Sequence, residues 1–415
     1  MSSNSPRDWT VLMDYSENPF LSRGLASTTL HPLGLEVESA EGPWIRLTEN
    51  RWLFDAISGI GVSNVGHRHP AVHASLQRQL DAHLHTLVYG EFLQEAQTSA
   101  AKLLLATLPE ELNSVYFLNS GAEAIDAALK LAKRVTRRRR MFAVTGGYHG
   151  NTHGALSVSS NESRKATFRP LLPEVEFLTW NDSRDLSRID NEVACVVVET
   201  VQGDAGVRIP EPEWLSALAS RCKETGTLLI LDEIQCGMGR TGKMWAFEHF
   251  NLVPDVVCMG KALGGGMPIG AVVSSRINMG QLAHAPSLGH ITTFGGHPMA
   301  CAGAAGALQV LSSLDFGHVE AQNMRWQNAL NAHPAVVATR RIGAFHAVEL
   351  RDAAAVQRAV EAGLDVKPGE KGVLLFWFLS VPNAFRLAPP LTASTEEMAE
   401  GLELVLRALD EAAKG

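Results

Sequence analysis

Residues 228–270 read LLILDEIQCGMGRTGKMWAFEHFNLVPDVVCMGKALGGGMPIG, and this stretch holds two short apolar runs that each lead to a charged side chain. The first run, 228–231, ends on Asp232, and the second, 256–259, leads to Lys261 with three glycines just beyond it. Short runs that are apolar throughout predict strands buried on both faces of a parallel sheet. The stretch therefore predicts an acid at the end of one buried strand and a lysine at the end of another.

An acid and a lysine in this arrangement are the groups that pyridoxal phosphate (PLP) chemistry requires. The lysine amine forms an imine with the aldehyde, and the acid keeps the pyridine nitrogen protonated so that the ring accepts electrons. Taken singly, a lysine near glycines usually lies in a solvated loop, and an aspartate at a strand end often caps a turn. The pair, Asp232 followed by Lys261 in this order, favours the catalytic interpretation.

The composition is that of an ordinary globular protein and excludes several other classes. Hydrophobic residues make up 46% and charged residues 19% of the 415 positions, and the formal net charge of −8 argues against a nucleic-acid partner. The basic run 137–140 is interpreted as a solvated helix end. Five cysteines without a CxxC spacing predict reduced thiols. With no secretory signal pattern and no apolar stretch of membrane length, we expect a soluble, cytoplasmic protein with no membrane partner.

Strand and helix patterns alternate through the middle of the chain, which predicts an α/β fold with a mainly parallel central sheet covered by helices. The expected strands are residues 115–118, 141–144, 194–198 and 227–231. Helices are expected over 122–134 and from Pro212 to Gly226. We expect a large domain over 61–298, and a smaller α+β domain built from 1–60 and 299–415. Its last helix should begin at Ser394, with Glu397 completing a capping box.

From about Gly34 to the last helix, the sequence resembles the class III, or omega-type, aminotransferases, nearest to the acetylornithine, ornithine and gamma-aminobutyrate group. The stretch quoted above carries the match at Asp232, Glu233, Ile234, Gln235, Gly239, Arg240, Thr241, Gly242, Pro254, Asp255 and Lys261. The resemblance implies the aspartate-aminotransferase-like fold and PLP as cofactor. Two rivals are an aminomutase or racemase of the same fold and a non-catalytic PLP-binding relative. The Gly-Arg-Thr-Gly run at 239–242 argues against the first, and the intact Asp232, Gln235 and Lys261 argue against the second.

The segment Asn119-Ser120-Gly121-Ala122-Glu123 stands between an expected strand and an expected helix. Ser120 and Glu123 have the spacing of a capping box. Free backbone N–H groups at a helix N-terminus also suit a phosphate. The resemblance implies that Ser120, Gly121 and Ala122 bind the PLP phosphate.

The resemblance also assigns residues to the cofactor ring. Tyr148 would stack on one face of the pyridine. Ile234, two residues beyond Asp232, would point the same way along an extended strand and cover the other face. Gln235 would reach the phenolic oxygen.

The stretch His290-Ile291-Thr292-Thr293-Phe294-Gly295-Gly296-His297-Pro298 resembles a family motif whose threonine contacts the partner subunit's cofactor. It implies that Thr293 acts across a homodimer with shared active sites; His297 replaces the usual asparagine. The loop Gly66-His67-Arg68-His69-Pro70 has an H-x-H spacing but lacks the further ligands that zinc needs, so we expect no metal site.

Substrate residues are also implied by the resemblance. Arg386 would bind the carboxylate of a 2-oxo acid, and residues 199–206 read ETVQGDAG where relatives read EPxQGExG, which places Glu199 and Asp204 in the site. Asp204 is one methylene shorter than the usual glutamate, so its pair with Arg386 is expected to be longer or looser. Asn151 stands where the ornithine and acetylornithine enzymes carry a carboxylate-binding arginine. We therefore expect a ping-pong aminotransferase that uses 2-oxoglutarate, with acetylornithine and ornithine as poor donors. The sequence leaves the donor itself open.

Overall fold

The computed structural model describes residues 18–29 and 32–414, and its largest sheet has seven strands in the order β4-β10-β9-β8-β7-β5-β6. These strands are β4 (Ser114–Leu118), β5 (Arg140–Val144), β6 (Val175–Leu178), β7 (Val193–Glu199), β8 (Leu228–Asp232), β9 (Val256–Gly260) and β10 (Gly270–Ser274). The strands β6, β5, β7, β8 and β9 run parallel, whereas β10 is antiparallel to both β4 and β9. The predicted mainly parallel sheet is confirmed.

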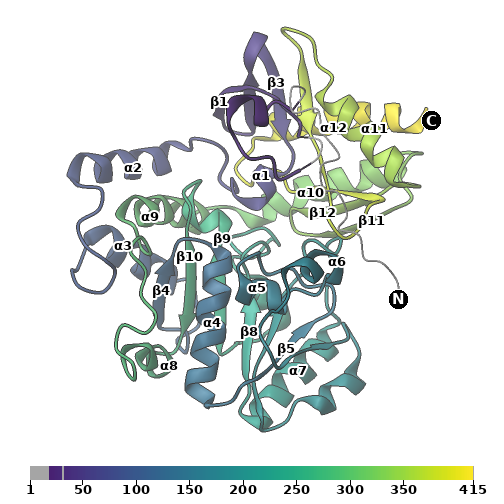
Figure 1. The fold of residues 1–415 in the computed structure, drawn as a ribbon. Coiled ribbons are helices and arrows are strands. Elements are labelled where there is room, and N and C mark those ends of the chain that lie inside the picture. The colour runs from purple at the N-terminus through teal and green to yellow at the C-terminus, as the bar shows by residue number, and fades with distance from the viewer. Residues whose placement is uncertain (1–17, 30–31, 415) are drawn as a thin grey trace, which may run out of the picture.

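Helices cover both faces of this sheet (Figure 1). On one face lies α4 (Gly121–Thr136), which packs in one buried cluster with Ile230 of β8. On the other face lies α7 (Pro212–Thr225), whose Trp214 joins a second cluster with Leu229 and Leu231. Successive strand residues therefore alternate between the two clusters, as the pleat of a strand requires. This burial on both faces explains why the strands are apolar throughout. The helix α7 ends at Gly226, whose φ of 65° lies in the left-handed region that glycine adopts readily.

Three further helices pack together at the edge of the sheet that carries β4. They are α2 (Pro70–Ala82), α3 (Glu95–Leu105) and α9 (Pro298–Ser312). The contact is close, since a Cβ on Gly306 of α9 would lie 2.8 Å from the Cα of Val72 in α2. The helix α9 lies beyond the expected domain boundary at residue 298, yet it packs against helices from before that boundary. The division into 61–298 and two flanking parts stays a prediction.

Two four-stranded sheets are built from the ends of the chain. One has the order β1-β2-β3-β13, from β1 (Val37–Glu41), β2 (Trp44–Leu47), β3 (Arg51–Asp55) and β13 (Lys371–Leu374); β3 and β13 are parallel neighbours, so N-terminal and C-terminal segments share it. The other has the order β11-β12-β15-β14, from β11 (Ala338–Ile342), β12 (Phe345–Glu349), β14 (Phe376–Trp377) and β15 (Ala384–Leu387). Residues 1–17, which the sequence also assigned to the smaller domain, lie outside the described residues.

The remaining helices are α1 (Ser58–Gly61), α5 (His153–Val158), α6 (Glu162–Lys165), α8 (Arg276–Gly280), α10 (Phe316–Ala332), α11 (Ala353–Leu364) and α12 (Thr395–Ala413). The capping box expected at Ser394 and Glu397 is present at the start of α12. Across residues 18–29 and 32–414, no single helix has the length and apolarity to cross a membrane. By length and composition alone, α9 and α10 together meet both criteria, as a pair bent by 82°.

Candidate active site

Three neighbouring strands, β7, β8 and β9, end at the same edge of the large sheet. Glu199 at the end of β7 is the register partner of Asp232 at the end of β8, and Asp232 is in turn the partner of Cys258 in β9. A cavity of about 470 Å³ opens at this edge. It brings together nine residues that the sequence predicted for the site: Gly121, Ala122, Tyr148, Asn151, Glu199, Asp232, Ile234, Gln235 and Lys261.

Lys261 follows β9 directly, at the start of a 3-10 turn, Lys261–Gly264. Its φ of 42° lies in the left-handed region, which is uncommon for a residue with a side chain and tends to occur at functional sites. Burial lowers the pKa of Lys261, and the nearby charges of Asp232 and Glu199 oppose this only in part. A lysine with a lowered pKa is neutral more of the time, which is the form that acts as a nucleophile or base.

Asp232 is paired with a histidine that sequence reasoning missed. Nδ1 of His149 lies 2.7 Å from Oδ2 of Asp232, and both side chains are buried. Burial alone would lower the pKa of His149, but the hydrogen bond to Asp232 and its charge outweigh burial and raise it. His149 lies inside the motif Gly147–Gly150 that pointed to Tyr148, so its place beside Tyr148 was the available signal. The pair fixes the carboxylate of Asp232 at the cavity wall.

The expected extended strand through Ile234 is wrong. The strand β8 ends at Asp232, and the backbone N–H of Ile234 donates to Oδ1 of Asp232 over 3.0 Å, which turns the chain. Ile234 still reaches the cavity, because its side chain lies against Gly121: a Cβ on that glycine would stand 2.9 Å from Ile234. Only glycine at position 121 leaves room for this contact.

The N-terminus of α4 departs from the expected capping box in one bond. Ser120 Oγ accepts from the backbone N–H of Glu123 over 3.2 Å, as predicted. The carboxylate of Glu123, however, accepts from the backbone N–H of Asn119 over 2.8 Å rather than from that of Ser120. Ser120 does not line the cavity, whereas Gly121 and Ala122 do. Their position at a helix start suits an anion.

Glu199 holds two loops in place. Its Oε1 accepts from the backbone N–H of Tyr148 over 2.8 Å and its Oε2 from that of Gly203 over 2.9 Å. Burial raises the pKa of Glu199 to about 7. Tyr148 in turn accepts a hydrogen bond at its hydroxyl from Nδ2 of Asn151 over 3.3 Å. Glu199 therefore holds the backbone of Tyr148, whose ring the resemblance assigned to the cofactor.

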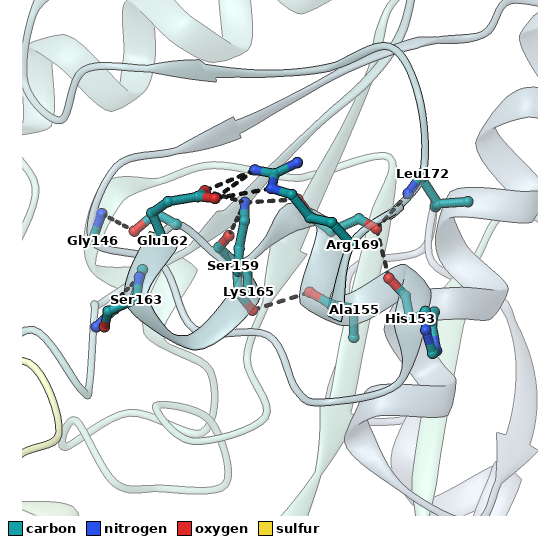
Figure 2. Close-up of polar contacts among 12 residues, drawn as sticks. Gly146, His153, Ala155, Ser159, Glu162, Ser163, Lys165, Arg169 and Leu172 are labelled. Atoms are coloured by element: carbon teal, nitrogen blue, oxygen red, sulfur yellow. Dashed lines mark hydrogen bonds and ion pairs between the residues drawn. The ribbon is translucent and has the colours of Figure 1, made fainter. Parts of the chain in front are cut away.

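A buried lysine, Lys165, binds the chain segment whose Ser159 contacts the His149 loop; Figure 2 shows Lys165 beside Ser159. Nζ of Lys165, at the end of α6, donates to the backbone oxygen of Ser159 over 2.9 Å and lies 4.5 Å from the ring centre of Phe177. Ser159 Oγ accepts from the backbone N–H of His149 over 2.9 Å. Lys165 therefore supports His149 through Ser159.

Besides Ser120, three of the predicted site residues do not line the cavity: Arg386, Asp204 and Thr293. Arg386 and Asp204 are buried and contact each other, with Nη2 3.3 Å from Oδ1. This single contact agrees with the expectation of a longer or looser pair. Thr293 is exposed on the loop before α9, while its neighbour Thr292 accepts from Nδ2 of Asn119 over 3.0 Å.

The two histidines of the H-x-H loop bind protein groups. Nε2 of His67 lies 2.8 Å from Oδ2 of Asp55, and His69 caps α2 by accepting from the backbone N–H of Ala71 over 3.2 Å. Within the part of the chain that the structure describes, no group of three or more histidine, cysteine or acidic side chains could hold a metal ion.

The family model for class III aminotransferases matches residues 26–409 of this chain. The chain belongs to the class III aminotransferases. Its family makes it a PLP-dependent aminotransferase, and the predictions of family, enzyme class and cofactor are confirmed. The cavity fits this cofactor. It offers a lysine of lowered pKa, a buried aspartate fixed by a histidine, and two residues at a helix start.

Proteins similar to this chain are also aminotransferases. An acetylornithine aminotransferase of Methanopyrus kandleri is 41% identical over 273 residues, which are 65% of this chain and 69% of that protein. A putrescine aminotransferase of Pectobacterium atrosepticum is 34% identical over 94% of this chain and 86% of its own. The crystal structure of the ornithine aminotransferase from Toxoplasma gondii superposes on this aminotransferase with a TM-score of 0.85 at 27% identity, covering 95% of this chain and 94% of the other.

Proposed function

We propose that this aminotransferase moves the amino group of a donor to 2-oxoglutarate in two half-reactions at the cavity where β7, β8 and β9 end. The observation that carries the proposal is the shared cavity of Lys261, with its lowered pKa, and the Asp232–His149 pair. The base and the charge-stabilising acid thus stand at the same cavity. When bound, PLP supplies an electron sink for the carbon that loses its proton.

Each residue then has a distinct role. The neutral amine of Lys261 takes a proton from the donor carbon and delivers it again, as base and then as acid. The carboxylate of Asp232, oriented by His149, stabilises positive charge on the pyridine nitrogen. Gly121 and Ala122 would hold the phosphate at the start of α4, with Ser120 supporting that turn from its capping position.

The ring and the substrate would be held by the remaining residues. Tyr148 and Ile234 would enclose the two faces of the ring, and Gln235 would bind its phenolic oxygen; all three line the cavity. Arg386 would bind the carboxylate of the 2-oxo acid, because a guanidinium pairs with a carboxylate through two parallel hydrogen bonds. Asn151 is neutral, so acetylornithine and ornithine should be poorer donors than a substrate that needs no charge at position 151.

Two experiments test this function. Borohydride reduction of the loaded enzyme, followed by peptide mapping, should place the cofactor on Lys261; a label on another lysine would contradict the assignment. Turnover should also require an added 2-oxo acid. Turnover without one would favour the aminomutase or racemase instead. If the enzyme with bound PLP converts no amino donor, the interpretation as a non-catalytic PLP-binding protein is favoured.

We also propose that the enzyme is a homodimer with shared active sites and that it is located in the cytoplasm. The loop of Thr293 exposes three large apolar side chains, Leu288, Ile291 and Phe294, each more than half accessible. Clustered apolar exposure of this kind suits a subunit interface. All five cysteines are buried and unpaired, which suits a reducing compartment.

A further inference from the structure

Four consecutive residues near the cavity form a left-handed helical turn. The residues of α1, Ser58–Gly61, have φ values of 48°, 57°, 67° and 76° in chain order. The backbone N–H of Gly61 donates to the oxygen of Ile57 over 2.9 Å, which is the spacing of a helical hydrogen bond. Residues with a side chain adopt this region singly rather than in succession, and Ile60, branched at Cβ, is strained there. A turn of this kind persists only where the surrounding structure holds it.

The turn stands against the side chain of Lys261. A Cβ on Gly61 would lie 4.0 Å from Cδ of Lys261 and 3.6 Å from Cγ of Gln235, and both of these side chains line the cavity. Figure 1 shows α1 between β3 and β9, the strand that leads to Lys261. The amine of a lysine ends a flexible four-carbon stem, so it is held at one point only where that stem is packed. The backbone of Gly61 provides such packing for Lys261.

Asp55, the last residue of β3, holds the start of the turn. Its side chain is fully buried, and Oδ1 accepts from the backbone N–H of Ile57 over 3.1 Å and from that of Gly59 over 3.3 Å. Oδ2 lies 2.8 Å from Nε2 of His67. The strand β3 is itself paired on both sides, with β2 and β13. The carboxylate of Asp55 therefore ties the turn to a fixed point of the sheet.

Ser58 gives the turn a second anchor. Its Oγ donates to the backbone oxygen of Ala388 over 2.7 Å and accepts from Nη2 of Arg240 over 3.2 Å. Arg240 is fully buried, and its Nη1 donates to the backbone oxygens of Ala344 and Pro389. Neither Ser58 nor Arg240 lines the cavity, so both affect it through the segments that they hold.

We infer that Asp55 is a positioning residue for the amine of Lys261, because it holds the left-handed turn that packs against the lysine side chain. This rests on the proposed function of Lys261 as the base. A carboxylate suits the task, since hydrogen bonds to a charged acceptor are stronger than those to a neutral one. Without it, the backbone at Ile60 is free to relax toward the common negative φ. Gly61 would then leave the stem of Lys261, and a shift of about 1 Å in a reacting group lowers a rate by up to about 100-fold.

Variants of the two anchors test the inference in the half-reaction with glutamate, the amino acid that 2-oxoglutarate yields. Asp55→Ala should lower kcat by roughly 10- to 100-fold with little change in KM, measured by cofactor absorbance after adding glutamate alone. Asp55→Asn keeps an oxygen for the two N–H groups and should retain most of the rate, and Ser58→Ala should cause a smaller loss. The matched control is Asp315→Ala, whose Oδ1 accepts from the N–H groups of Gly317 and His318 outside the cavity. It should lower stability and leave kcat unchanged.

Removing the lysine separates positioning from a merely structural role. In Lys261→Ala, added methylamine should restore part of the turnover as a free base, and Asp55→Ala in that background should change the rate by less than about 2-fold, because no stem is left to position. Without substrate, amide exchange of residues 57–62 should become faster in Asp55→Ala and not in Asp315→Ala. A tenfold loss that persists with methylamine, or unaltered exchange, would overturn the inference alone. Full turnover of Lys261→Ala without methylamine would overturn the proposed role of Lys261 as well.

Discussion

Nδ1 of His149 stands 2.7 Å from Oδ2 of Asp232, and Nε2 of the same ring has no partner among the residues that the structure describes. The ring is thus held from one side only, by the acid it orients. Its backbone is fixed separately through Ser159. A histidine in this position keeps a buried carboxylate aimed at one point, which is what a charge-stabilising group requires.

Replacing His149 with alanine should lower kcat by roughly 10- to 100-fold, because the carboxylate of Asp232 loses the group that orients it. The side-chain amide of His149→Gln can still donate to Asp232, so that variant should recover part of the loss. The pH dependence of the cofactor absorbance should shift in the alanine variant. An unchanged pH profile with lower kcat would mean that His149 serves folding alone.

Asp232→Asn removes the charge and keeps the shape of the side chain. We expect a folded protein with weaker PLP binding and a kcat lower by about 100-fold or more, by analogy with other groups that stabilise charge. The matched control is Asp255→Asn, an exposed acid that accepts from the backbone N–H of Leu229 outside the cavity. It should lower stability without altering the absorbance of the cofactor. Near-normal turnover of Asp232→Asn would contradict its role.

Glu199 should make stability depend on pH. Burial raises its pKa in the folded protein to about 7, above the ordinary value of 4.5, so folding favours the protonated form. Its contribution to stability is full below pH 4.5 and is lost as the pH rises through about 7. The Tm of Glu199→Gln relative to the wild type should therefore improve between pH 5 and pH 8. Glu213→Gln, at an exposed glutamate, serves as control, and a relative Tm that falls with pH would contradict the expectation.

Lys165→Met should destabilise the protein by about 1.5–3 kcal/mol, since the backbone oxygens of Ser157 and Ser159 lose a charged donor. Urea unfolding measures this. Amide exchange should also become faster around residues 146–160, where Lys165 supports the Tyr148 loop. Lys165→Arg keeps a donor and should lose less. Unaltered exchange in the methionine variant would show that the loop stands without the lysine.

Thr293→Ala should weaken PLP binding about 10-fold while the protein stays a dimer, if the exposed hydroxyl binds the cofactor of the partner subunit. Sedimentation at low concentration measures the assembly, and cofactor titration measures the affinity. An active wild-type monomer at that concentration would rule out a shared site.

The sequence by itself determined five strands of the large sheet, β4, β5, β7, β8 and β9, together with the family and the cofactor. Short runs that are apolar throughout and bounded by turn residues indicate strands covered on both faces, and the order of Asp232 and Lys261 after two such runs indicated that the two side chains meet at one edge. The helix start at Ser120 could also be predicted, because a capping pattern involves only residues that are close together in the sequence.

Only the tertiary structure decided the partners that come from distant parts of the chain. His149 lies 83 positions from Asp232, and Ser380 lies 176 positions from Asp204, so no local pattern connects them. The turn after Asp232 that overturned the extended path to Ile234 depends on a side chain bonding its own backbone, which competes with strand geometry. Hydrogen bonds of buried carboxylates are settled by which donors packing brings within reach, and that is a property of the folded chain.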